Sequence, residues 1–142
     1  MDELDVNNLI GALNNEENAY LLKLNNEKIK TIKNNVLQEI GYQGSELKQL
    51  HKKLKCYRFV DELEDVRYGS YIRWINLKNP EKIKLCNGGF ITSMNMSNDD
   101  IYITCRNNMN RFFRVRMNDA IIFQRNTPQE EILLKVLDYL KT

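Results

Sequence analysis

The sequence predicts an α+β protein, in which a small antiparallel β-barrel is preceded by a helical N-terminal arm and followed by a packing helix. Two observations carry this prediction. Between residues 67 and 125, short apolar-rich runs alternate with clusters of Gly, Pro, Asn and Asp, which is typical of a small barrel or sandwich. On both sides of this region, apolar residues recur at helical spacing. We therefore expect a helical arm over 1–55 and a barrel domain over 56–142.

The arm begins with a predicted helix over 5–40. Asp5 is a candidate N-cap, and no Pro interrupts the segment. Leu22, Ile29 and Val36 lie seven residues apart, which is the spacing of a coiled coil. The sustained pattern is shorter than the three or four heptads that a coiled coil normally needs. Two interpretations therefore remain open, an oligomerising coiled coil and a helix or helical hairpin that packs within its own chain.

A second, shorter helix is expected after Gly41. Leu47, Leu50 and Leu54 lie on one face of it, and its other face is basic. Such a face can contact phosphate, but a solvated face explains it as well. His51, the only histidine, lies on the same helix, and we expect it to be exposed.

The barrel region contains seven predicted strands. They run over 56–61, 70–77, 82–86, 90–96, 101–105, 111–117 and 120–125. Asn87-Gly88-Gly89 supplies the positive φ angles that a hairpin turn or bulge requires, and no helix follows it that would make a phosphate-binding loop. In the last strand, Ile121 and Phe123 are expected to point into the core.

The entry to the barrel resembles a known fold. An acidic bend at 61–65 leads to Gly69 and then to the apolar and basic strand at 70–77. This arrangement is similar to the second strand of SH3-like barrels of the Tudor, chromo and KOW types. The resemblance implies that the barrel is SH3-like. An OB-like barrel is the alternative fold for the same strands.

The chain ends in a predicted helix over 128–141. Thr127, Pro128 and Glu130 form a capping box with Pro at the first helical position. An apolar stripe follows, and we expect it to dock on the barrel.

Composition indicates a protein that stays in the compartment where it is made. The chain has 142 residues, of which 42% are hydrophobic and 28% charged. No apolar run approaches the roughly 18 residues of a membrane span, and the acidic first residues are unlike a secretory signal or a transit peptide. The three cysteines are odd in number and widely spaced, which favours a reducing interior over a disulfide framework. We expect an intracellular protein of cytoplasm or nucleus, with no membrane partner.

The sequence predicts neither an enzyme nor a metal protein. No nucleophile-elbow, Walker or dinucleotide motif is present, so no cofactor or small-molecule substrate is expected. Four acidic residues crowd the bend at 61–65, but no further ligand completes a cation site. Cys56, Cys86, Cys105 and His51 lack the close pairing of zinc ligands, so we expect the cysteines to be small buried side chains on strands.

The best functional signal is positive charge on the strands. Residues 67–125 hold ten basic and four acidic side chains, although the whole chain has a net charge of only +2. Aromatic residues interleave with these cations, as on platforms that bind single-stranded nucleic acid. The candidate binding residues are Tyr71, Arg73, Lys82, Lys84, Arg106, Arg111, Phe112, Arg114 and Arg116.

Two functions fit this pattern. The first is a non-enzymatic interaction or assembly module, in which the helices serve attachment or self-association and the basic barrel face serves recognition. The alternative is a nucleic-acid-binding protein that uses the same face. The Asn-rich composition, with 19 Asn, resembles that of small uncharacterised proteins of large eukaryotic DNA viruses. That resemblance implies no activity; with it, the interaction or assembly module is expected to be a viral structural or accessory protein, part of a virion or of another large assembly.

Overall fold

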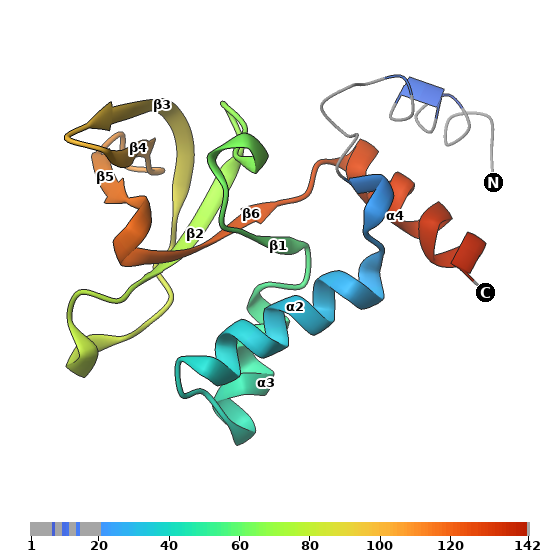
Figure 1. Cartoon of the computed structure of the whole chain (residues 1–142), viewed down its shortest axis with the longest axis horizontal. Coiled ribbons are helices and arrows are strands. Elements are labelled where there is room, and N and C mark those ends of the chain that lie inside the picture. The colour runs from blue at the N-terminus through green and yellow to red at the C-terminus, as the bar shows by residue number, and fades with distance from the viewer. Residues whose placement is uncertain (1–6, 8–9, 12–13, 15–20, 142) are drawn as a thin grey trace. The chain divides into compact units, whose positions relative to one another are not determined.

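The computed structural model describes residues 7, 10, 11, 14 and 21–141 of the chain. They belong to two compact units (Figure 1). Residues 57–125 make up the sheet unit, whereas the residues up to 56 and those from 126 onward make up the helical unit. Each unit contains its own hydrophobic cluster.

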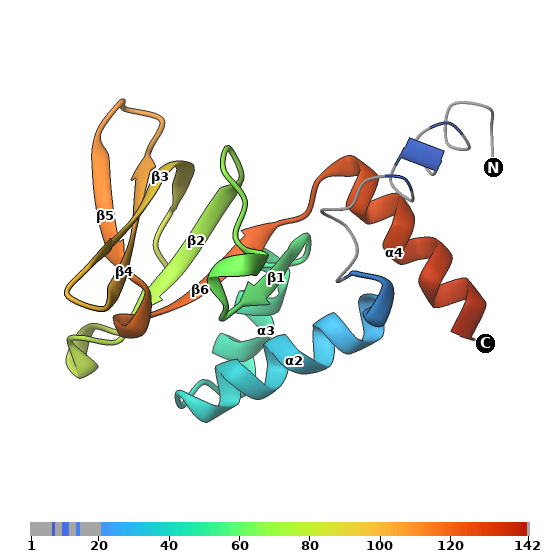
Figure 2. The same cartoon turned by 45° about the horizontal axis from the view of Figure 1, so that its top comes forward.

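Six antiparallel strands form a single sheet in the sheet unit. They are β1 (Tyr57–Val60), β2 (Tyr71–Asn76), β3 (Gly89–Ser97), β4 (Asp100–Arg106), β5 (Phe112–Arg116) and β6 (Ala120–Arg125). Their order in the sheet is β1-β6-β2-β3-β4-β5, and Figures 1 and 2 show β6 running between β1 and β2. The predicted α+β class is confirmed. The sheet is not closed into a barrel, because β1 and β5 are edge strands.

Turn chemistry and one bulge shape the meander from β3 to β5. Asn98 and Asp99 connect β3 to β4 with φ angles of 50° and 66°. Positive φ at both central positions is the type I′ geometry, whose twist matches that of the flanking strands. Near the start of β3 the register shifts between Ile91 and Ser93. Such a bulge bends its strand, and β3 is visibly curved in Figure 1.

The predicted strand at 82–86 is wrong. The chain makes a 3₁₀ turn, η3 (Pro80–Lys82), and afterwards only Leu85 bridges to Ile75 of β2. The amide of Cys86 donates to the carbonyl of Trp74 at 2.8 Å, and Nε of Arg73 donates to the carbonyl of Cys86 at 2.8 Å. Because the carbonyl of Cys86 accepts its hydrogen bond from the Arg73 side chain and not from a backbone amide, residues 83–86 lie along β2 without forming a regular strand ladder with it.

The core of the sheet unit lies on one face of the sheet. Its buried members are Val60, Val66, Ile72, Trp74, Ile91, Ile103, Cys105, Val115 and Ile122. The prediction that Ile121 and Phe123 point into this core is wrong. Ile122 pairs with Trp74 and joins the core, whereas Phe123 pairs with Arg73 on the opposite face and contacts Phe59 there at 6.2 Å between ring centroids. Both faces of β6 are apolar, so alternation alone cannot choose between them.

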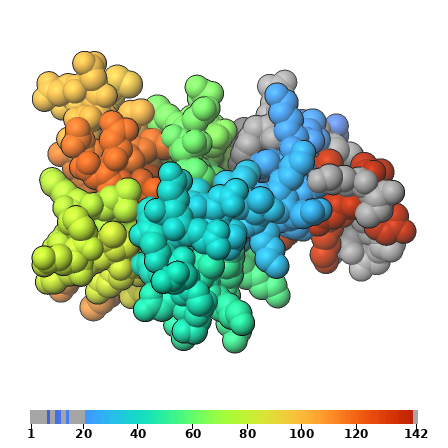
Figure 3. All heavy atoms as spheres, turned by 60° about the horizontal axis from the view of Figure 1, so that its bottom comes forward, coloured from blue at the N-terminus to red at the C-terminus, as the bar shows by residue number. Residues whose placement is uncertain are grey.

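Three helices of the helical unit lie within residues 21–141. They are α2 (Asn26–Glu39), α3 (Gly44–Lys53) and α4 (Pro128–Lys141). In the space-filling view, α2 and α3 pack against each other (Figure 3). Nζ of Lys33 reinforces this contact, because it donates to the carbonyl of Leu54 at 2.7 Å, just after α3. None of the described helices combines the length and apolar character that crossing a membrane requires.

The uninterrupted helix predicted over 5–40 is wrong. Residues 7, 10, 11 and 14 are helical, residues 15–20 lie outside the described part, and α2 begins only at Asn26. Asn25 has an extended backbone, and its side-chain oxygen caps the helix by accepting from the amide of Lys28 at 2.8 Å. Asn26 is held by Asp138 of α4, whose two carboxylate oxygens each accept a hydrogen bond from it at 2.7 Å. Asparagine side chains compete for the backbone in this way, which explains the break.

The capping box at the start of α4 is present as predicted. The Thr127 hydroxyl accepts from the amide of Glu130 at 3.1 Å, and the Glu130 carboxylate accepts from the amide of Thr127 at 2.8 Å. Leu133 and Leu134 of α4 are fully buried in a cluster with Ile29 and Leu21. We expected this helix to dock on the barrel; in the structure its apolar stripe packs against α2 and the segment before it.

Candidate functional site

Most of the candidate binding residues lie on the sheet face opposite to the core. Residues that pair across strands share a face, because side chains alternate along each strand. Tyr71 pairs with Phe90, Phe90 with Arg106, and Arg106 with Phe112. This row therefore crosses β2, β3, β4 and β5 on one side. We call this side the outer face. Its aromatic and basic members on β2–β5, together with one residue of β6, are Tyr71, Arg73, Phe90, Tyr102, Arg106, Phe112, Arg114, Arg116 and Arg125.

Rings and guanidinium groups lie next to one another along the row. Tyr71 meets Phe90 edge-on with 5.0 Å between centroids, and Cζ of Arg125 lies 4.4 Å from the centre of the Tyr71 ring. Phe90 is 43% exposed and Phe112 is 64% exposed, and Arg106 between them is exposed as well. The outer face thus presents aromatic surface and positive charge side by side.

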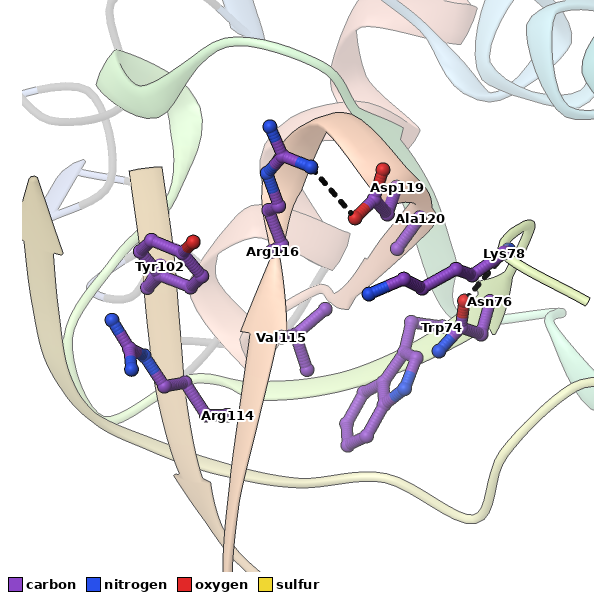
Figure 4. Close-up of a pocket in the computed structure, with 9 residues that line it drawn as sticks. All are labelled: Trp74, Asn76, Lys78, Tyr102, Arg114, Val115, Arg116, Asp119 and Ala120. Carbon is purple, nitrogen blue, oxygen red and sulfur yellow. Dashed lines mark hydrogen bonds and ion pairs between the residues drawn. The ribbon is translucent and has the colours of Figure 1, made fainter. Parts of the chain in front are cut away.

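A second line of outer-face residues lies further along β4 and β5. Cζ of Arg114 stacks 3.8 Å from the centre of the Tyr102 ring (Figure 4). Arg116 is different, because it forms ion pairs with Asp100 at 2.8 Å and Asp119 at 3.2 Å. Hydrogen bonds from Arg116 to these two carboxylates raise its pKa above the ordinary value. The charge of Arg116 is therefore compensated within the sheet unit.

The other predicted residues are less well placed. Arg73 belongs to the outer face by register, but its Nε is held by the carbonyl of Cys86. Lys82 ends the turn η3, and Lys84 is exposed on the segment that follows. Arg111 lies in the turn before β5, where its amide donates to Oδ1 of Asn107 at 3.0 Å. The structure thus brings six of the nine predicted residues to one face and leaves Lys82, Lys84 and Arg111 off it.

Sequence reasoning missed three residues of this face, Phe90, Tyr102 and Arg125. Each lies in a predicted strand, where side chains alternate between the two faces of the sheet. Its face could therefore have been predicted relative to its neighbours in the same strand. What the sequence did not show was the register. Only the pairing of Phe90 with Tyr71 and Arg106, and the contact of Arg125 with Tyr71, places these side chains in the row.

Two open cavities lie beside the edge strand β5, and both are lined by Trp74, Asn76 and Arg114. The smaller, of about 260 Å³, also contacts Val115, and Figure 4 shows Trp74 and Val115 together with the paired Arg116 and Asp119. The larger, of about 550 Å³, extends between the segment 84–88 and the loop 107–109. These cavities occur where the sheet fails to close.

The remaining groups singled out from the sequence show little organised chemistry. Among the described residues, no three His, Cys, Asp or Glu side chains gather as a metal site would require. Burial raises the pKa of the Asp65 carboxyl in the acidic bend, with help from Asp61 and Glu64.

The cysteines and the histidine differ in their surroundings. All three thiols are free, and burial raises the pKa of Cys105 to about 12. Cys56, expected to be buried, is exposed, because it lies just before β1 and not within it. The expectation that His51 is exposed is also wrong. It is half-buried, 2.9 Å from Oδ1 of Asn34, and burial lowers its pKa.

Comparison of the chain with protein-family models, with curated proteins and with solved structures finds no match.

Proposed function

We propose that the protein is a non-enzymatic binding module and that its outer face binds single-stranded nucleic acid. The observation that carries the proposal is the cross-strand row, in which Arg125, Tyr71, Phe90, Arg106 and Phe112 follow one another across five strands. Platforms for single strands combine aromatic rings, on which bases stack, with cations that meet the phosphates.

The exposure of the rings separates this face from an ordinary solvent face. A solvated sheet face normally alternates apolar residues inward with polar residues outward, so exposed Arg and Lys alone mean little. Phe90 and Phe112 are different, because both are large, exposed apolar side chains that flank Arg106. From Tyr71 to Phe112 the row crosses four strands and so spans about 14 Å at the usual strand spacing. In RNA-recognition modules, a four-stranded sheet stacks two or three bases on its aromatic side chains.

The charge on the outer face is also suitable for a polyanion. Two carboxylates, those of Asp100 and Asp119, form ion pairs with arginines of the outer face, and both pair with Arg116. Arg106, Arg114 and Arg125 form no ion pair with a described carboxylate. Three phosphate contacts on a single strand correspond to a slope of about −2 in the logarithm of affinity against the logarithm of salt. Affinity should then fall about 20-fold between 50 and 200 mM salt.

Fluorescence anisotropy of a labelled oligothymidylate, measured over this salt range, tests the proposal. Arg106→Gln should reduce the magnitude of the slope by about 0.7, because one phosphate contact is lost. Phe112→Ala should weaken binding about tenfold at every salt concentration without changing the slope, because a ring contributes stacking and not charge. Lys82→Gln and Met96→Ala are matched controls. Lys82 is an exposed cation in η3, and Met96, 68% exposed, lies on the other side of the sheet.

The outcomes separate nucleic acid from an acidic protein partner. Competition by oligonucleotide but not by polyglutamate supports the proposal. The proposal is contradicted if no oligonucleotide binds at 50 mM salt, or if the control variants lose as much affinity as the outer-face variants. It is also contradicted if polyglutamate competes as well as oligonucleotide, and that result favours the assembly module.

A second candidate function is self-association through the helical unit. Ile29, central to the predicted heptads, is buried against α4 and is therefore used within the chain. Leu22 and Leu140, however, are 55% and 74% exposed. Light scattering on the whole chain should give a mass above that of a monomer, and Leu22→Gln with Leu140→Gln should lower it. A monomeric mass for the unmodified chain rejects this candidate.

We also infer that the sheet is an open form of the SH3-like barrel that the sequence resembles. The meander β2-β3-β4-β5, the 3₁₀ turn η4 (Met117–Asp119) and the return of β6 to pair with β2 support this inference. We expect an experimental structure to show β5 curling toward β2 without pairing with a further strand. A flat sheet with β5 far from β2 contradicts it.

A further inference from the structure

The larger cavity beside β5 has the composition of a site for a planar, anionic ligand. We call it the seam pocket; it lies between β2, the segment 84–88, the loop 107–109 and the start of β5. Its volume of about 550 Å³ falls within the range of about 300–1,000 Å³ that is typical of small-molecule sites.

Three rings line the seam pocket, those of Tyr71, Trp74 and Phe113. Phe113 pairs with Cys105, so it lies on the core side of the sheet, yet it is 44% exposed. This exposure arises because β5 is an edge strand and no further strand covers it. An aromatic surface is therefore available to a ligand at a position where a closed barrel would bury it.

Amide groups supply the polar part of the lining. Oδ1 of Asn76 accepts from the amide of Lys78 at 2.9 Å, and its Nδ2 forms no hydrogen bond with any described residue. The side-chain amides of Asn87 and Asn108 form no hydrogen bonds within the described part of the chain either. Each amide offers both a donor and an acceptor, which is the chemistry that reads the edge of a base.

The charge of the lining decides the class of ligand. Lys84 and Arg114 are the charged members of the described lining, which contains no carboxylate. A methylated ammonium ligand also favours aromatic walls, but two cations beside it would repel it. A phosphate group would instead be attracted to both.

The wall formed by the segment 84–88 is fixed before any ligand arrives. The Tyr71 hydroxyl donates to the carbonyl of Asn87 at 2.7 Å, and Nε of Arg73 donates to that of Cys86 at 2.8 Å. Gly88 packs so closely on β2 that a Cβ there would overlap the carbonyl oxygen of Ile72. Preformed walls reduce the ordering cost of binding.

We propose that the seam pocket receives one unpaired base of the strand bound on the outer face, with its phosphate between Lys84 and Arg114. This proposal rests on the proposed function, since Tyr71 and Arg114 belong to both the outer face and the pocket. The outer face would supply affinity that is independent of sequence, and the pocket would supply a preference among bases.

Two variants of the whole protein test this, Asn76→Leu and Phe113→Ala, in binding assays with four homo-oligonucleotides of one length. The unmodified protein should prefer one base at least fivefold, and its single tryptophan, Trp74, should change in fluorescence on binding. Both variants should remove the preference while leaving the salt slope at its original value. Arg106→Gln should do the reverse. Because Asn76 is exposed, Asn76→Leu keeps the test valid if Phe113→Ala fails to fold.

The possible results are distinguishable. If oligonucleotides bind with the expected salt slope but equally for all four bases, or if both variants keep the preference, the pocket proposal is overturned and the proposed function stands. If no oligonucleotide binds at 50 mM salt, both the pocket proposal and the proposed function of the outer face are rejected. A trimethyl-lysine peptide that quenches Trp74 when nucleoside 5′-monophosphates do not would also overturn the pocket proposal.

Discussion

Replacement of Gly88 by alanine tests how firmly the segment 84–88 is held against β2. Gly88 has a φ of 95°, a conformation that side chains disfavour. A Cβ at this position would overlap the Ile72 carbonyl oxygen and lie 3.0 Å from Cγ of Arg73 and Cε1 of Tyr71. The Ile72 oxygen belongs to the backbone of a buried strand, so it cannot move aside cheaply. The segment itself must shift.

The expected cost has two parts. The positive φ alone costs about 1 kcal/mol for alanine relative to glycine. Displacement of the segment also threatens three hydrogen bonds, from the Tyr71 hydroxyl, from Nε of Arg73 and from the amide of Cys86. At about 0.5–1.5 kcal/mol each, these add about 1.5–4.5 kcal/mol. We therefore expect Gly88→Ala to lower the free energy of unfolding by about 2.5–5.5 kcal/mol.

Gly69 provides the matched control. It has a φ of 79°, but apart from its chain neighbours no atom of a described residue lies within 4 Å of the place that an added Cβ would occupy. Gly69→Ala should therefore cost only about 1 kcal/mol. Urea unfolding followed by the fluorescence of Trp74 measures both variants in the sheet unit. If the two variants lose equal stability, within about 0.5 kcal/mol, the close packing of the segment on β2 is refuted.

Three further predictions concern two fully buried side chains, Cys105 and Gln124, and the helix cap Thr127. Burial raises the pKa of Cys105 to about 12 from its ordinary value of 9.0, so this thiol ionises at lower pH in the unfolded chain than in the folded protein. The free energy of unfolding should therefore be unaffected by this thiol below pH 9. Between pH 9 and 12 it should fall by about 1.4 kcal/mol per pH unit. The same titration of Cys105→Ala should lack this slope, and an unchanged slope contradicts the prediction. Thr127→Ala should destabilise the helical unit by about 1 kcal/mol in thermal unfolding followed by circular dichroism, whereas Thr127→Ser should be nearly neutral. Gln124→Met should lower the free energy of unfolding, measured in urea, by about 2–4 kcal/mol. Gln124 is fully buried; its Oε1 accepts from the Arg67 amide at 2.9 Å, and its Nε2 donates to the Asp65 carbonyl at 3.0 Å. A loss below about 1 kcal/mol would show that other hydrogen bonds replace these two.

Local chemistry was the part of the fold that the sequence predicted well. The capping box of Thr127 and Glu130 requires only four consecutive residues. The break between the predicted strands at 90–96 and 101–105 is a turn with only two central residues, Asn98 and Asp99. Both signals are complete within the segment that they control. The interruption at Asn25 was harder to predict, because it also depends on Asp138, far along the chain.

Register was the part that the sequence could not supply. Ile121, Ile122 and Phe123 are all apolar, and only the pairing of Ile122 with Trp74 decides which of them enters the core. The same limit applies to the candidate site. Alternation placed Phe112 among the outward residues, but Arg106 was expected at the adjoining turn, and nothing in the pattern showed that Phe90 lies in register beside Arg106.

The failure of the sheet to close and the proposed binding function are connected by the edge strand β5. Closing the barrel would cover Phe113 and fill the space beside Trp74, so it would remove the seam pocket. It would leave the outer face intact, because that face points away from the core. Binding to the outer face therefore does not require an open sheet, whereas a preference among bases does. A preference for one base that disappears with Asn76→Leu, while affinity persists, would assign a function to the open edge itself.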